Sequence, residues 1–162
     1  MNDNDAQPIH ERIFLVVVDQ SEELRVAVRY ASKRAAHTGG RVALLYIEET
    51  PEVQHWQAVE ELMREELRQK AEATLQQWSK LVQEWSGKTP VLFVREGNAR
   101  DVVLKVLDEE KSVSILVLAA AAGKKGPGPL ITALTGKMWK SVTIPMTIVP
   151  GGLSDEEIDA LT

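Results

Sequence analysis

Residues 13–19 read Ile-Phe-Leu-Val-Val-Val-Asp, an unbroken apolar run that ends in a single carboxylate. Because β-branched residues dominate it and no polar residue alternates with the apolar ones, the run predicts a strand buried on both faces, as a central parallel strand is. Ser21, Glu22 and Glu23 follow and predict a helix start, since a hydroxyl can cap a free amide and acids favour the positive end of the helix dipole. Together these elements predict half of a βαβ unit, and open α/β sheets bind ligands at the carboxyl edge of their strands.

Length, composition and charge restrict the class of protein. With 162 residues, the chain has room for one α/β domain with a sizeable core. The absence of cysteine excludes disulfides and thiolate metal sites and suits a reducing compartment. The formal net charge of -5 argues against a nucleic-acid partner, which would favour a basic face. The first residues do not resemble a signal peptide, and no apolar stretch approaches the roughly 20 residues of a membrane span. We therefore expect a cytoplasmic protein with no membrane contact.

Apolar runs and helical stripes alternate along the chain. Strands are predicted at residues 13–18, 42–47, 90–94, 114–119 and 144–149. Helices are predicted at residues 22–37, 51–85 and 129–141, and after the capping residues Asn98 and Ser154. Because the two kinds of element alternate, the rule for crossover handedness favours a parallel, doubly wound α/β sheet.

The pattern predicts one domain, because it contains no internal repeat and no second core. The sequence Ser-Asp-Glu-Glu that begins at Ser154 has the capping-box pattern, which predicts a short helix that covers Ile158 and Leu161. The expected divisions are a disordered lead-in, a single domain and a short C-terminal helix or tail, at residues 1–11, 12–151 and 152–162.

The helix predicted at residues 51–85 is unusually long for a domain of this size. At about 1.5 Å per residue it would extend for about 50 Å, which is more than the width of a small domain. Either it breaks in its charged middle, around residues 64–70, or one end projects beyond the sheet. An apolar projecting end would favour contact with a partner chain.

Three segments of the chain, in this order and at this spacing, carry a family resemblance. They read Phe-Leu-Val-Val-Val-Asp-Gln-Ser-Glu at 14–22, Val-Arg-Glu-Gly-Asn at 94–98, and Ile-Leu-Val-Leu at 115–118 followed by Ile-Pro-Met-Thr-Ile-Val-Pro at 144–150. They resemble the VxVDGSE, vxxGdp and cPVLVVp segments of the universal stress protein (UspA-like) family. The resemblance implies a Rossmann-like α/β fold with a five-stranded parallel sheet, strand order 3-2-1-4-5 and helices on both faces. It also implies a homodimer.

The resemblance also raises the question of a nucleotide site. Some members of the family bind ATP through an aspartate after the first strand and a loop of the form G-x2-G-x9-G-[ST] after the fourth. Asp19 stands at the position of that aspartate. Glycines allow backbone amides to approach phosphate oxygens, and the start of a helix adds favourable potential. The loop of this chain can be aligned with that pattern in two ways.

The first alignment uses Gly123, Gly126 and Gly136 and leaves Lys137 at the hydroxyl position. It requires a helix that begins at Gly136, so that about six residues and about 9 Å of helix remain before the next strand. A strand of about 17–20 Å must then be spanned on the return, which so short a helix does not achieve.

The second alignment begins the helix at Pro129, which suits the first turn of a helix. About thirteen residues then give about 20 Å of helix, so we favour this alignment, although it leaves Gly136 inside a helix at a cost of about 1 kcal/mol. The ATP fingerprint has decayed on this interpretation. The glycine positions hold Ala119, Ala122 and Thr132, and the hydroxyl position holds Ala133.

Two interpretations of the loop and of the aspartate stay open. The glycine-rich stretch at residues 123–128 could cradle an anion with the charge of its lysines, or it could be a solvated turn. Asp19 could contact a ligand, or it could bond local amides at the start of the helix. The candidate nucleotide-binding residues are Asp19, Gly123, Lys124, Lys125, Gly126 and Gly128.

The functional hypotheses follow from these features. The leading one is a cytoplasmic, non-catalytic module of stress response or regulation, homodimeric, with a decayed ATP loop. The alternative is a protein that binds ATP or AMP through Asp19 and the loop at residues 120–128. A nucleotide-hydrolysing enzyme is the third, but it would need a general base or metal carboxylates beyond Asp19. We predict no catalytic residue and no metal site, since His10, His37 and His55 are scattered and no nucleophile motif occurs.

Overall fold

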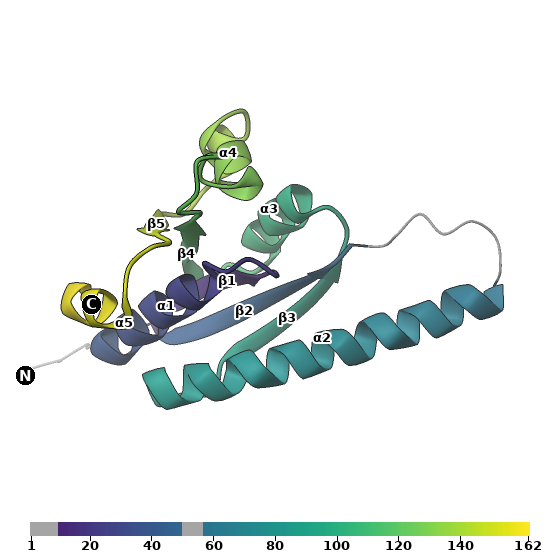
Figure 1. The fold of residues 1–162 in the computed structure, drawn as a ribbon, viewed down its shortest axis with the longest axis horizontal. Helices are drawn as coiled ribbons and strands as arrows, with labels where there is room; N and C mark the ends of the chain where they lie inside the picture. Colours follow the sequence, from purple (N-terminus) through teal and green to yellow (C-terminus); the bar gives the residue numbers. More distant parts are fainter. Residues whose placement is uncertain (1–9, 50–56) are drawn as a thin grey trace, which may run out of the picture.

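The structure is a computed structural model that describes residues 10–49 and 57–162 (Figure 1). Strands and helices alternate along the chain as the sequence predicts. The strands are β1 (Ile13–Val18), β2 (Arg41–Glu48), β3 (Val91–Glu96), β4 (Val113–Ala120) and β5 (Met146–Pro150). The helices are α1 (Leu24–Thr38), α2 (Gln57–Ser86), α3 (Ala99–Glu109), α4 (Pro129–Thr135), the 3₁₀ turn η1 (Trp139–Ser141) and α5 (Asp155–Leu161).

The five strands form one parallel sheet in the order β3-β2-β1-β4-β5, which confirms the predicted fold class. β1 lies in the middle, and all six of its residues are buried. Its side chains alternate between two cores. Phe14, Val16 and Val18 pack with residues of α1, α2 and α5, and Leu15 and Val17 pack with residues of α3 and α4. Helices therefore cover both faces of the sheet.

The first helix differs from the prediction at its start. α1 begins at Leu24, and the residue before it, Glu23, makes no side-chain capping bond. The predicted cap by Ser21 is wrong, because the hydroxyl of Ser21 donates a hydrogen bond to Asp19 instead. The helix ends at Thr38, close to the predicted end at residue 37, because Gly39 takes a left-handed conformation with φ of 70°.

The long helix α2 is continuous from Gln57 to Ser86, so of the two alternatives the break around residues 64–70 does not occur. Its expected start at Thr50 and Pro51 lies outside the described residues. The 30 residues of α2 make a helix of about 45 Å. Its second half packs on α1 and β2 through Ala71, Leu75 and Val82, which are buried. Its first half projects beyond the sheet (Figure 1).

The connection between β4 and β5 begins as the second alignment requires, because α4 starts at Pro129. The predicted extent of the helix to residue 141 is wrong, since α4 ends at Thr135 and the short turn η1 follows. Gly136 is not inside the helix. It ends the helix, with φ of -97° and ψ of -112°, and its amide donates to the carbonyl oxygen of Thr132. A short helix and a turn thus complete the return to β5.

The C-terminal helix α5 packs against α1. The predicted capping box is present, because the side chains of Ser154 and Glu157 each accept a hydrogen bond from the other's backbone amide. Ile158 is fully buried, whereas Leu161 is exposed, so the expectation that the helix covers both residues is wrong for Leu161. Arg29 of α1 donates two hydrogen bonds to the carboxylate of Asp159, at 2.9 and 2.6 Å.

None of the helices that the structure describes combines the length and the apolar character needed to cross a bilayer.

The two halves of α2 should respond differently to the loss of a leucine. We expect Leu75→Ala to lower the free energy of unfolding by about 2–5 kcal/mol, because it removes a buried side chain and leaves a cavity. Leu62→Ala is the matched control in the projecting half, where the side chain is 61% exposed. It should change stability by less than about 0.5 kcal/mol. Denaturant unfolding measures both values, and an equal loss at Leu62 would show that the projecting half is covered in solution.

The packing of α5 on α1 should weaken in acid. The hydrogen bond from Arg29 lowers the pKa of Asp159, and the positive charge of the same side chain lowers it further. A carboxyl group whose pKa is lowered in the folded state stabilises that state fully when the pH is above the ordinary pKa of 3.8. This stabilisation is lost as the pH falls through the lowered pKa. We expect the NMR signal of the Ile158 methyl group to report detachment of α5 over that range. Asp159→Asn should weaken the packing at neutral pH and reduce its pH dependence, and Asp101→Asn on α3 should do neither.

Candidate functional site

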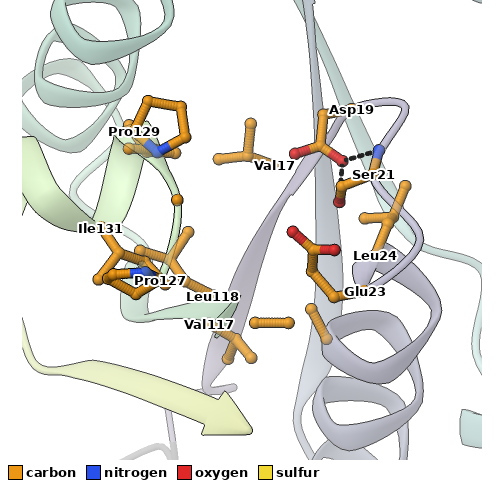
Figure 2. Close-up of a pocket in the computed structure, with 14 residues that line it drawn as sticks. Val17, Asp19, Ser21, Glu23, Leu24, Val117, Leu118, Pro127, Pro129 and Ile131 are labelled. Carbon is orange, nitrogen blue, oxygen red and sulfur yellow. Dashed lines mark hydrogen bonds between the residues drawn. The ribbon is translucent and has the colours of Figure 1, made fainter. Parts of the chain in front are cut away.

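A cavity opens at the carboxyl edge of the sheet between β1 and β4, where the strand order reverses. Open α/β sheets bind their ligands at such a point. The cavity has a volume of about 90 Å³, and we call it the β1–β4 cavity. Its walls come from the ends of both strands, the start of α1 and the start of α4 (Figure 2). The lining residues are Val17, Asp19, Ser21, Glu23, Leu24, Ala27, Val117, Leu118, Ala119, Pro127, Gly128, Pro129, Leu130 and Ile131.

Asp19 follows β1 directly and lies at the rim of this cavity. Its Oδ1 atom accepts hydrogen bonds from the backbone amide and the hydroxyl of Ser21, at 2.9 and 2.6 Å (Figure 2). The local bonding that the sequence left as one alternative is therefore present. The side chain also borders the cavity, and within the described residues its Oδ2 atom accepts no hydrogen bond. One oxygen holds the turn, and the other is available to a ligand.

Glu23 also lines the β1–β4 cavity, although it is not among the candidate residues predicted from the sequence. It precedes the first residue of α1, is half-buried and directs its carboxylate toward the same opening as Asp19 (Figure 2). The chain after β5 passes close to it, because a Cβ atom on Gly151 would lie 2.9 Å from the Cβ of Glu23. The sequence identified Glu23 only as an acid at a helix start. Its direction depends on the turn at residues 19–23, which no local pattern specifies.

The loop after β4 contributes only part of what the sequence predicts. Gly128 lines the β1–β4 cavity, between two prolines. The predicted residues Gly123, Lys124, Lys125 and Gly126 are exposed and do not line it. The loop is closed by a hydrogen bond of 3.0 Å from the amide of residue 121 to the carbonyl oxygen of residue 127. Of the candidate residues, the structure thus brings Asp19 and Gly128 together at one cavity and places the other four outside it.

A second, larger cavity lies on the other side of Asp19, and we call it the β1–β2 cavity. It has a volume of about 400 Å³ and is lined by the ends of β1 and β2, by α2 and by the start of α3. Val17 and Asp19 line both cavities, so Asp19 stands between them. Tyr46 and Leu67 supply apolar surface, and Lys70 supplies a positive charge.

No group of three or more histidine or acidic side chains in residues 10–49 and 57–162 could hold a metal ion. The prediction of no metal site concerns the whole chain and remains a prediction.

The fold is shared with solved structures of low sequence identity. A universal stress protein UspA from Lactobacillus plantarum superposes with a TM-score of 0.69 at 16% identity, over 86% of this chain and 98% of that one. A universal stress protein in complex with cAMP superposes with a TM-score of 0.59 at 16% identity, over 87% of this chain and 98% of that one. A universal stress protein family protein from Arabidopsis thaliana with AMP bound superposes with a TM-score of 0.57 at 14% identity, over 90% of this chain and 94% of that one.

The sequence comparisons identify the family. A search of curated protein sequences found no match. The sequence model of the universal stress protein family matches residues 11–150, which extend from just before β1 to the end of β5. This span contains the sheet, both cavities and the three segments that carry the resemblance. The chain belongs to the universal stress protein family.

Proposed function

We propose that this protein is a non-catalytic, cytoplasmic regulatory module that binds an adenine nucleoside or nucleotide at the carboxyl edge of its sheet. The observation that carries the proposal is the position of Asp19, which borders both cavities at the point where the strand order reverses. The AMP-bound and cAMP-bound proteins of the same fold support an adenine ligand. Regulation would then follow from occupancy of the site.

The chemistry of the two cavities suits such a ligand. The β1–β2 cavity, at about 400 Å³, lies within the range of about 300–1,000 Å³ that is usual for small-molecule sites. Tyr46 and Leu67 give this cavity apolar surface against which a planar base can pack. The hydroxyl groups of a ribose are hydrogen-bond donors, and the Oδ2 atom of Asp19 is an acceptor. A carboxylate between two cavities can therefore orient a ligand that occupies both.

The absence of catalysis remains part of the proposal. Hydrolysis of a nucleotide would need a general base or metal carboxylates aimed at a phosphate. On the second alignment, with which the start of α4 at Pro129 agrees, the glycine positions of the family hold Ala119, Ala122 and Thr132, and the hydroxyl position holds Ala133. Release of phosphate above the buffer background, abolished by Asp19→Ala, would contradict this part of the proposal.

A homodimer is also part of the proposal. β5 is an edge strand, so one side of its backbone is not paired within the sheet. Ile148 on this strand is 41% exposed and Trp139 in the preceding turn is 59% exposed, which gives the edge an apolar surface. Light scattering at several protein concentrations tests the assembly, and a monomer at every concentration would contradict it.

Calorimetric titration with adenosine and AMP tests the binding site. We expect wild-type protein to bind both, and Asp19→Asn to bind at least about tenfold more weakly, since it removes a charged acceptor. Asparagine still accepts the amide of Ser21, so the turn should persist. The matched control is Asp108→Asn on α3, whose side chain is 86% exposed and which lines neither cavity.

The same titration tests the loop lysines that the sequence proposed. Lys124→Ala/Lys125→Ala should leave the affinity for adenosine unchanged, because both side chains lie outside the cavity lining. The absence of heat from the wild type with every adenine ligand would end the proposal of a nucleotide site.

A further inference from the structure

We infer that the site selects its ligand by charge, and that Glu23 makes it prefer an adenine nucleoside over a nucleotide with a phosphate chain. This inference rests on the function proposed above. It follows from the composition of the β1–β4 cavity, from the backbone donors available there and from the fixed position of Glu23.

The first observation is the sign of the charge around the β1–β4 cavity. Asp19 and Glu23 both line it, and none of the lining residues that the structure describes is Lys, Arg or His. The two carboxylates point toward the same opening (Figure 2). A phosphate placed there would meet two like charges and no opposite one. Because the cavity is partly enclosed by protein, these charges are screened less than on an open surface.

The second observation concerns the backbone, which is the usual alternative source of donors to phosphate. Pro127 and Pro129 flank Gly128 in the cavity wall, and proline has no amide hydrogen. The helix α4 that begins here has only 7 residues, so it offers little dipole to an anion. The part of the loop that lines the cavity thus has no basic side chain, and two of its residues have no amide hydrogen to donate to a phosphate.

The third observation is that Glu23 is held in place. Its carbonyl oxygen accepts the amides of Val26 and Ala27 in the first turn of α1, at 3.0 and 3.3 Å. The chain at Gly151 also passes close to its Cβ atom. The backbone of Glu23 therefore stays beside the cavity when a ligand enters. Glu22, its neighbour, is exposed and does not line the cavity, so it provides a matched control.

The experiment compares adenosine, AMP and ATP by calorimetry in a buffer with EDTA, so that no divalent cation bridges phosphate and carboxylate. We expect the wild type to bind adenosine most tightly, AMP more weakly, and ATP at least about tenfold more weakly than adenosine. Glu23→Gln should strengthen the binding of AMP and ATP by about three- to tenfold and leave adenosine within about twofold. Glu22→Gln should leave all three affinities unchanged. Added salt should reduce the difference between adenosine and ATP, because it screens the repulsion.

The outcomes separate this inference from the function on which it rests. Wild-type protein that binds ATP as tightly as adenosine would overturn the inference and leave the nucleotide site standing. Equal effects of Glu23→Gln and Glu22→Gln would overturn the role of Glu23. Wild-type protein that binds none of the three ligands would contradict the proposed function itself and the inference with it. Glu23→Ser keeps a residue that favours helix starts and should act in the same direction as Glu23→Gln, which guards against loss of folding in one variant.

Discussion

The burial of β1 between two layers of helices is the constraint on which the rest of the structure depends. Its six side chains alternate between the two cores, and its backbone pairs with β2 on one side and with β4 on the other. The chain winds to β2 and β3 on one side of β1 and to β4 and β5 on the other, so the β1–β2 and β1–β4 cavities open at the carboxyl end of β1. Asp19, the first residue after the strand, lines both cavities for this reason. Its place in the site is a consequence of how deeply the preceding strand is buried.

A second constraint joins the C-terminal segment to the same edge of the sheet. After β5 the amide of Gly151 donates to the carbonyl oxygen of Ala120 at 2.8 Å, and the chain passes over the start of α1. Helix α5 then inserts Ile158 into the core, while Arg29 holds it from α1 and also stacks on the ring of Trp85, 5.1 Å from its centroid. These contacts fix the start of α1, which directly follows Glu23. The acidic wall of the cavity therefore depends on residues far apart in the sequence.

The lengths of the helices show where local patterns stop being informative. The apolar stripe of α2 predicted a long helix correctly, but only the packed structure shows that it stays unbroken and that its first half lies beyond the sheet. For α4 the sequence indicated the start at Pro129, since proline favours the first turn. It indicated the wrong end, residue 141 instead of Thr135, because whether Gly136 is tolerated in a helix or ends one depends on where the chain must go next. The distance to β5, which decides this, is a property of the whole sheet.

The sequence by itself determined the order of the elements, the buried character of the central strands, the family and the position of Asp19 at the end of β1. These depend on hydrophobic periodicity and on turn chemistry, which act over a few residues. Only the tertiary structure decided which side chains surround the cavity, because it brought Glu23 from the turn before α1 to the same cavity as Gly128 from the distant loop and left Lys124 and Lys125 outside. Side chains from different elements meet at a site only when those elements pack together. The linear sequence does not specify the directions in which these side chains then point.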